Sequence, residues 1–380
     1  MRLLLYPFAL LYGLGVRLRN ALFDNRFLAS TGFQVPVISV GNLTAGGTGK
    51  TPHVEYLAGL LHDTYNVAIL SRGYRRRTRD FRMVSTASAV HEVGDEPLQM
   101  KGKFPDIRVA VDRHRVHGVE ELMKLSPQVE CVLLDDAFQH RAIRPGCSIL
   151  LVDFMRPPEK DHLLPAGMLR EPASGKRRAN IILVTKSPPD LKPIELREYV
   201  KTYEPGIGQH LYFTTMRYGP PIPVFPDSAQ SLLPDLNPIA DDPGSEDPGQ
   251  QPAGILIVTG VAGKNALLDY ATELCGNIRE IRFGDHHRYR QKDLEMICST
   301  FLEMQGHGHE DVFVITTEKD AVKIRELEVS EELRRTMFAI PVEVHFLNED
   351  KQNFDRQIQN YVRDNKRSSI LHQGTAADYS

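Results

Sequence analysis

Residues 34–54 read QVPVISVGNLTAGGTGKTPHV, and this stretch decides the fold. Its first part, 35–40, is a short β-branched apolar run that predicts a buried parallel strand. The glycines of 41–49 exclude a regular element, and a helical apolar pattern follows Lys50 and Thr51. Strand, glycine loop, Gly-Lys-Thr and helix form the context that a phosphate-binding loop requires.

The loop predicts a site for nucleotide phosphates. Backbone N–H groups at the start of a helix attract anions, Lys50 would reach the outer phosphates, and the Thr51 hydroxyl would ligate Mg²⁺. Thr44 stands where the usual pattern begins with a glycine, although Gly46 and Gly47 would supply the tight turn. The alternative interpretation is a glycine-rich turn before an ordinary helix.

The composition is that of a folded protein, with 41% hydrophobic and 25% charged residues. At 380 residues the chain exceeds the usual size of one core, so we expect about two domains. A net charge of −3 gives no electrostatic case for a nucleic-acid partner. The four cysteines lack metal-ligand spacing, which favours reduced core residues in a cytosolic setting.

The N-terminal residues 1–28 combine large apolar groups with flanking arginines. The apolar run 3–16 is too short to span a bilayer, and Pro7, Gly13 and Gly15 interrupt it. Arg17 and Arg19 beside aromatic groups are typical of a helix that lies in the interface of an anionic membrane. The alternative is an amphipathic helix docked on the protein's own core, and both would hold if one face packs and the other meets lipid.

Two later strands end in polar residues, at the edge where open α/β sheets bind ligands. The predicted strand 67–70 leads into the basic cluster 71–77, which would hold phosphates, face lipid or form a solvated loop. The predicted strand 131–134 ends in Asp135 and Asp136. Downstream of a phosphate loop, one such carboxylate would hold Mg²⁺, directly or through water.

Three further positions bear on the site. Asp95 lies in a turn just before a helix, which favours a helix N-cap. The loop 163–172 exposes Arg170 and Glu171. Pro188 stands where a guanine-reading loop has an aspartate, which favours ATP over GTP.

The second half of the chain predicts a second, smaller α/β domain. Residues 226–253 are rich in Pro, Asp, Ser and Gly, which indicates a long, exposed and mobile acidic insert. Strands and helices alternate again after it. We therefore predict an N-terminal interface helix at 1–28, a core with a helix-flanked parallel sheet at 29–212, a linker at 213–254, a smaller α/β domain at 255–365 and a disordered tail at 366–380.

Seven motifs together resemble one family. They read GNLTAGGTGKTP at 41–52, SRGY at 71–74, GDEP at 94–97, DDAFQH at 135–140, PAGMLREP at 165–172, FGDHHRY at 283–289 and TEKDAVK at 317–323. This combination resembles the tetraacyldisaccharide 4'-kinases of lipid A biosynthesis, from the N-terminal segment to about residue 346. The combination is far more specific than any single motif.

The resemblance implies a P-loop NTPase-like lipid kinase. Such an enzyme moves the γ-phosphate of ATP, with Mg²⁺, to the 4'-hydroxyl of a tetraacylated glucosamine disaccharide 1-phosphate and forms a lipid A precursor, lipid IVA. Its partners would be the lipid-linked disaccharide and the membrane surface, at the cytoplasmic face of the inner membrane of a Gram-negative bacterium. We expect a peripheral or monotopic monomer.

The resemblance also implies residue roles. An Asp–His pair, Asp95 and His286, would activate the sugar hydroxyl, which gives Asp95 a role beyond the N-cap. A carboxylate oriented by imidazole can accept the proton of this poor nucleophile. Because the pair is split between domains, chemistry would await closure and ATP hydrolysis would be limited.

The remaining implied roles concern nucleotide, metal and closure. The nucleotide-binding residues are Thr44, Ala45, Gly46, Gly47, Thr48, Gly49, Lys50 and Thr51. The metal-binding residues are Thr51, Asp135 and Asp136. Arg170 and Glu171 would close the site around the transferred phosphate, and the secondary candidates are Gln139, His140, Arg72 and Tyr74.

Three other classes of protein deserve comparison. The triplet 285–287, Asp-His-His, is found in metal-dependent phosphoesterases, but their other acidic and histidine clusters are not evident. A membrane-associated switch ATPase has a signature lysine where Ala45 stands, and the second domain does not fit it. A soluble small-molecule kinase would not need the apolar N-terminal segment.

Overall fold

The computed structural model describes residues 2–228, 254–260, 266–306 and 312–377. The chain forms two compact units: unit 1 comprises Met1–Arg217 and Val344–Ser380, and unit 2 comprises Tyr218–Glu343. The predicted acidic insert lies outside the described residues from 229 onward.

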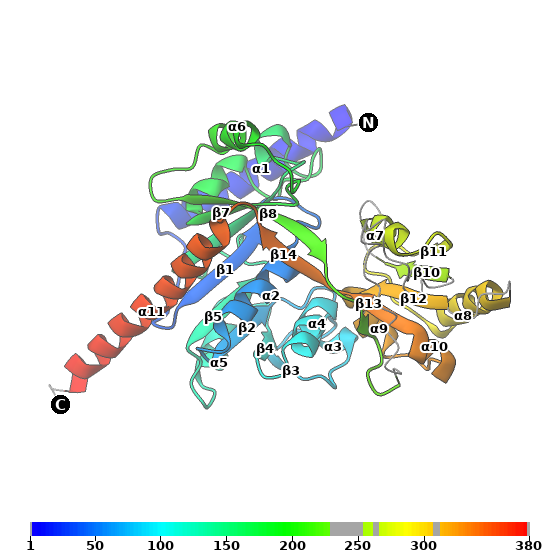
Figure 1. Cartoon of the computed structure of the whole chain (residues 1–380). Helices are drawn as coiled ribbons and strands as arrows, with labels where there is room; N and C mark the ends of the chain where they lie inside the picture. The colour runs from blue at the N-terminus through cyan, green and yellow to red at the C-terminus, as the bar shows by residue number, and fades with distance from the viewer. Residues whose placement is uncertain (1, 229–253, 261–265, 307–311, 378–380) are drawn as a thin grey trace. The chain divides into compact units, whose positions relative to one another are not determined.

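Unit 1 is built on a nine-stranded sheet with the order β14-β8-β7-β6-β1-β5-β2-β4-β3 (Figure 1). Its strands are β1 Val37–Asn42, β2 Val67–Ser71, β3 Arg82–Val84, β4 Arg108–Val111, β5 Cys131–Asp135, β6 Cys147–Asp153, β7 Ile181–Thr185, β8 His210–Tyr218 and β14 Val342–Phe346. The strands from β8 to β4 in this order pair in parallel, whereas β3 runs antiparallel to β4. The predicted α/β class with a large parallel sheet is confirmed.

Helices flank this sheet, and several of them bury apolar side chains against its strands. They are α1 Arg2–Asp24, α2 Lys50–Leu61, α3 Val90–Val93, α4 Asp95–Lys103, α5 Arg115–Met123, α6 Pro193–Tyr203 and α11 Asp350–Ala377, with short 3-10 turns η1 Pro158–Lys160 and η2 Ala173–Arg178. In α2, Val54, Leu57 and Leu61 are buried at helical spacing, which fixes the helix that follows the glycine loop.

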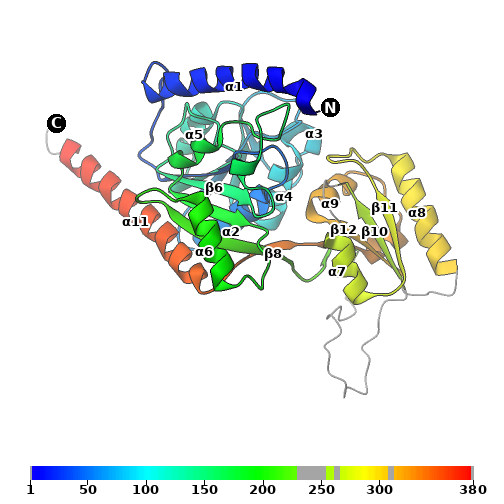
Figure 2. The same cartoon turned by 90° about the horizontal axis from the view of Figure 1, so that it is seen from above.

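Helix α1 runs along the outside of unit 1 without a break at Pro7 (Figure 2). Ala9 is buried, and a Cβ at Gly13 would lie 2.6 Å from the side chain of Leu163, so small residues let the helix approach this loop closely. Gly13, which we expected to interrupt the apolar run, therefore serves the packing of α1. Among the described residues, no helix has the length and apolar character needed to cross a bilayer.

The C-terminal helix α11 belongs to unit 1, which corrects the predicted domain end at 365. Phe354, Ile358 and Val362 form its buried stripe, and the Tyr361 hydroxyl donates to the carbonyl of Val37 at 3.1 Å. The predicted disordered tail is also wrong up to Ala377, where the helix ends. A helix already nucleated by packing propagates cheaply through a polar stretch that contains no proline.

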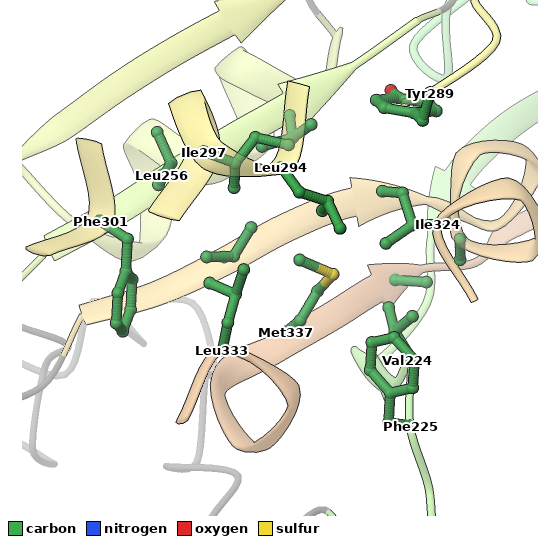
Figure 3. Close-up of a cluster of buried hydrophobic side chains, with 14 of the residues drawn as sticks. Val224, Phe225, Leu256, Tyr289, Leu294, Ile297, Phe301, Ile324, Leu333 and Met337 are labelled. Atoms are coloured by element: carbon green, nitrogen blue, oxygen red, sulfur yellow. The ribbon is translucent and has the colours of Figure 1, made fainter. Parts of the chain in front are cut away.

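Unit 2 has a five-stranded sheet with the order β11-β10-β12-β13-β9. Its elements are β9 Ile222–Pro223, β10 Gly254–Thr259, α7 Ala266–Leu274, β11 Ile278–Arg282, α8 Gln291–Gly306, β12 Val312–Thr317, α9 Glu318–Ile324, α10 Glu331–Thr336 and β13 Met337–Ile340. Figure 3 shows its core, where side chains of α8 such as Ile297 and Phe301 meet Met337 of β13. Val224 and Phe225 are buried in the same core, so this part of the predicted linker is structured.

Candidate functional site

The glycine loop connects the end of β1 to the start of α2. Gly46 and Gly49 have φ angles of 112° and 82°, in the left-handed region that favours glycine. Within the described residues, no protein acceptor bonds the backbone N–H groups from Gly46 to Thr51. The loop therefore presents free donors at the positive end of a helix dipole, as an anion site requires.

Neighbouring segments hold this loop in place. Thr44 forms a β-bridge with Leu169, and the Ala45 N–H donates to the carbonyl of Met168 at 2.7 Å. The Asn42 side-chain amide donates to the Thr48 hydroxyl at 2.8 Å. The anion-facing part of the loop is thus left open, while its start is tied to the 163–172 loop.

Thr185, the last residue of β7, and Lys186, which follows it, complete this support. The Thr185 hydroxyl donates to the carbonyl of Thr48 at 3.0 Å, and the Lys186 ammonium donates to the carbonyl of Gly47. Lys186 also pairs with Asp153 at 2.9 Å. Thr185 and Lys186 therefore hold the glycine loop in place from the neighbouring strand end.

Asp135 is the last residue of β5 and is almost fully buried. Its Oδ2 accepts a hydrogen bond from the Ser71 hydroxyl at 2.8 Å, whereas its Oδ1 has no partner among the described residues. Burial, followed by the charges of Glu96 and Asp136, raises the pKa of Asp135 to about 7. A buried carboxylate with an orphaned oxygen is a group that a cation would stabilise.

Asp136 lies beside the glycine loop with two basic partners. Its Oδ1 is 3.7 Å from Lys50 Nζ, and Arg170 donates to Oδ1 and Oδ2 at 3.0 and 3.1 Å. Burial acts to raise the pKa of Asp136, but Lys50 and Arg170 outweigh it and lower the pKa below its ordinary value. The structure thus brings the lysine, the arginine and the aspartate into one charged cluster.

Glu171 lies next to this cluster and is only 2% exposed, so the prediction that the loop exposes it is wrong. Arg178 donates to both of its carboxylate oxygens at 2.9 and 2.8 Å, and Gln139 donates to Oε1 at 3.0 Å. Asn20 of α1 also donates to Glu171, at 3.3 Å. The predicted Arg170, Glu171 and Gln139 therefore do come together, with Arg178 as a partner that sequence analysis missed.

Of the remaining secondary candidates, His140 lies near Asp136 and Arg72. His140 is half-buried, and burial together with the charges of Arg115 and Arg72 lowers its pKa to about 4, so its imidazole is neutral near pH 7. Arg72 is exposed, and the exposed Tyr74 ring lies under the Arg75 guanidinium at 5.6 Å.

Asp95 is the first residue of α4 and is 6% exposed. Gly94 occupies the N-cap with a φ of 95°, and the Asp95 carboxylate accepts from the adjacent Glu96 N–H at 3.0 Å. The N-cap interpretation of Asp95 is therefore wrong by one position. A glycine with positive φ starts the helix and leaves the aspartate inside its first turn.

His286 lies in unit 2, in the turn after β11, with a φ of 55°. Its backbone N–H donates to the carbonyl of Gly260 at 3.2 Å, and its Nε2 is 3.1 Å from Lys319 Nζ. The adjacent His287 stacks on Phe283 and pairs with Asp293 at 3.0 Å. His287 is thus a structural member of the triplet, and His286 is the one that contacts Lys319.

In unit 1 the parallel sheet brings together the glycine loop, Arg72 and the Asp135–Asp136 pair at the carboxyl ends of β1, β2 and β5, where α/β proteins bind ligands. A phosphate in the glycine loop would be surrounded by a lysine, an arginine and two acidic groups, as in enzymes that transfer phosphoryl groups. No cluster of three or more metal-ligating side chains occurs in the described part of the chain. The fold and the cluster together define the class of α/β phosphotransferases.

Comparison with known proteins names the family. Residues 1–363 match the family described as tetraacyldisaccharide-1-P 4'-kinase, and the chain belongs to this family. A tetraacyldisaccharide 4'-kinase of Bacteroides fragilis is 45% identical, with 97% of this chain and 95% of the relative covered. The corresponding Porphyromonas gingivalis protein is 35% identical over 95% of this chain and 98% of its own length.

A solved structure supports the same assignment. The crystal structure of LpxK from Aquifex aeolicus in complex with ATP is similar to this chain with a TM-score of 0.69 and 30% sequence identity. The match covers 95% of this chain and 99% of that one.

Proposed function

We propose that this protein is an ATP-dependent lipid kinase of lipid A biosynthesis. It transfers the γ-phosphate of ATP to the 4'-hydroxyl of a tetraacylated glucosamine disaccharide 1-phosphate. Membership of the tetraacyldisaccharide-1-P 4'-kinase family supports the reaction and the substrate. The observation that carries the proposal is the charged cluster of Lys50, Asp136 and Arg170 beside a glycine loop with free N–H donors.

The P-loop assignment gives each part of this cluster a task. The N–H groups of 46–51 hold phosphate oxygens of ATP. When ATP binds, Lys50 exchanges its ion pair with Asp136 for one with the outer phosphates, whose charge it neutralises. Arg170 stabilises charge on the transferred phosphate and is oriented by Asp136 and Gln139. Glu171, fixed by Arg178, shapes the wall on the acceptor side.

The residues present fit Mg²⁺. Thr51 and Asp135 would hold the ion, with Asp136 as an acceptor for its waters, since Mg²⁺ uses few protein ligands beside phosphate and water. The orphaned Oδ1 of Asp135 and its raised pKa support this fit. The bound ion would offset negative charge on the phosphates.

Asp95 and His286 are the proposed groups that activate the 4'-hydroxyl. Asp95 is buried at the positive end of α4, and its carboxylate accepts a backbone N–H, which orients it. His286 is contacted by Lys319. In this role Asp95 accepts the hydroxyl proton as the new bond to phosphorus forms.

Helix α1 is the proposed membrane-facing element. Its outward apolar residues are exposed, with Leu4 at 77%, Leu10 at 71% and Leu11 at 69%. The opposite side is bonded to the catalytic loops, because Tyr12 donates to the carbonyl of Arg170 at 2.7 Å and Arg19 to that of Gln139 at 3.1 Å. A peripheral monomer bound in this way at the cytoplasmic face of the inner membrane would receive its acyl substrate without extracting it from lipid.

The test is transfer of label from γ-labelled ATP to a tetraacyl disaccharide 1-phosphate in mixed micelles, with and without Mg²⁺. We expect a labelled lipid that forms only with Mg²⁺. Nucleotide binding without a labelled lipid would instead favour a switch ATPase. Full activity on a soluble acceptor with no dependence on detergent would favour a small-molecule kinase.

A further inference from the structure

A pocket lies in unit 1 beside the charged cluster, between the end of α1 and the sheet. Its volume is about 660 Å³, within the range of small-molecule sites. Its floor is made by Ser39 and Ser148, and its rim carries four arginines. These arginines are Arg26, Arg141, Arg144 and Arg178.

The floor of the pocket is polar, although side chains on the central strands of a sheet are normally apolar. Ser39 of β1 stands directly opposite Ser148 of β6, and the two are 1% and 7% exposed. The Ser39 hydroxyl has no hydrogen-bond partner within the described residues. A buried polar group left without a partner is costly, so this hydroxyl is suited to a ligand oxygen.

The rim has an excess of positive charge. Arg141 pairs with Asp24 at 2.6 Å, and Arg178 pairs with Glu171. In the described part of the chain, no carboxylate pairs with Arg26 or Arg144. His140 also lines the pocket and is uncharged near pH 7 because burial lowers its pKa to about 4. The two available guanidinium groups therefore favour an anion.

The backbone of Arg26 has a left-handed conformation that is unfavourable for a residue with a side chain. It has a φ of 62° just after α1, and the Leu28 N–H reaches back to the carbonyl of Leu22 at 3.1 Å. Such a helix end usually has glycine at the left-handed residue. An arginine there costs free energy without improving the turn, which points to a use for its side chain.

The pocket adjoins the reaction site. Arg178 lines it and holds Glu171, while Phe138 and His140 follow Asp136 in the same loop. An acceptor with its 4'-hydroxyl at the charged cluster has a second sugar and a 1-phosphate to place. We propose that this pocket binds the phosphate-bearing sugar of the acceptor, with Arg26 and Arg144 on the 1-phosphate. The proposal rests on the proposed function.

The experiment compares two acceptors, the tetraacyl disaccharide with and without its 1-phosphate, in micelles of uncharged detergent. Arg26→Gly removes the guanidinium and suits the backbone, so the thermal midpoint should not fall. We expect Arg26→Gly and Arg144→Gln each to raise KM for the phosphorylated acceptor about 10-fold and to change kcat by less than about 2-fold. KM for the acceptor without phosphate should not change. Arg197→Ala, an exposed arginine on α6, is the matched control and should behave as wild type.

The other outcomes overturn the proposal. Equal effects of both variants on both acceptors, or no effect on either, would exclude recognition of the 1-phosphate. A second arm adds phosphatidylglycerol to the micelles. If the variants lose activity only there, and equally with both acceptors, the pocket binds a membrane headgroup instead. Transfer to neither acceptor by the wild type would refute the proposed function itself.

Discussion

The substitution Asp135→Asn tests the free-energy cost of burying the Asp135 carboxylate charge in the site without nucleotide. Burial raises the pKa of Asp135 to about 7 from an ordinary value of 3.8, so the folded protein binds this proton more tightly than the unfolded chain does. The stability contributed by protonated Asp135 is complete below the unfolded pKa. It is lost progressively as pH rises to the folded pKa and stays lost above it.

The size of the stability change depends on how much of the pH range between the unfolded and folded pKa values the assay covers. Between about pH 5 and about pH 7, the wild type loses stability over about two pH units, which lowers its free energy of unfolding by at most about 2.7 kcal/mol. The asparagine variant has no charge to bury and avoids this loss. Its thermal midpoint relative to wild type should therefore rise by roughly 5 °C between about pH 5 and about pH 8.5.

The assay is calorimetric unfolding of both proteins with a chelator present. The substitution also perturbs the hydrogen bond from Ser71, but this effect is the same at both pH values. It therefore cancels when the midpoint difference at one pH is subtracted from that at the other. A midpoint difference that does not vary with pH would refute the raised pKa. Addition of Mg²⁺ and ATP should then stabilise wild type more than the variant, because only wild type supplies a carboxylate to the ion.

Three further outcomes are expected. Lys50→Ala should lower kcat/KM at least about 100-fold in the labelled-ATP assay and weaken ATP binding, since both need its charge on the phosphates; near-normal turnover would remove it from the site. Arg178→Ala leaves the buried Glu171 carboxylate without its charged partner, so the unfolding free energy should fall by about 2–4 kcal/mol, whereas an unchanged denaturation midpoint would mean that solvent replaces the pair. Leu10→Asp on the exposed side of α1 should reduce sedimentation with anionic vesicles without changing the thermal midpoint, and undiminished sedimentation would argue against α1 as the membrane contact.

The glycine loop and the Asp-Asp strand end could be predicted because local pattern determines them. A β-branched run before glycines specifies a buried strand, and Lys50 at the start of the next helix follows from chain order alone. Parallel topology then brings the end of β5 beside that loop. The joint position of Lys50 and Asp136 is thus a consequence of adjacent strands.

Long-range contacts gave no comparable signal. Arg178 and Lys186 are ordinary basic residues in the sequence, and only the folded chain shows that they hold Glu171 and the glycine loop. The membership of α11 in unit 1 was missed for a similar reason. Its apolar stripe, with Phe354 and Ile358, indicates burial but not the sheet against which it packs.

The most direct test of the central claim is the position of the new phosphate. Product made from tetraacyl disaccharide 1-phosphate and ATP should show, by phosphorus–proton correlation NMR, a second phosphomonoester on the 4'-carbon of the distal glucosamine. Formation of this product should disappear with Lys50→Ala. Phosphate at another hydroxyl, or consumption of ATP with the lipid unchanged, would contradict the assignment of this site as a 4'-kinase.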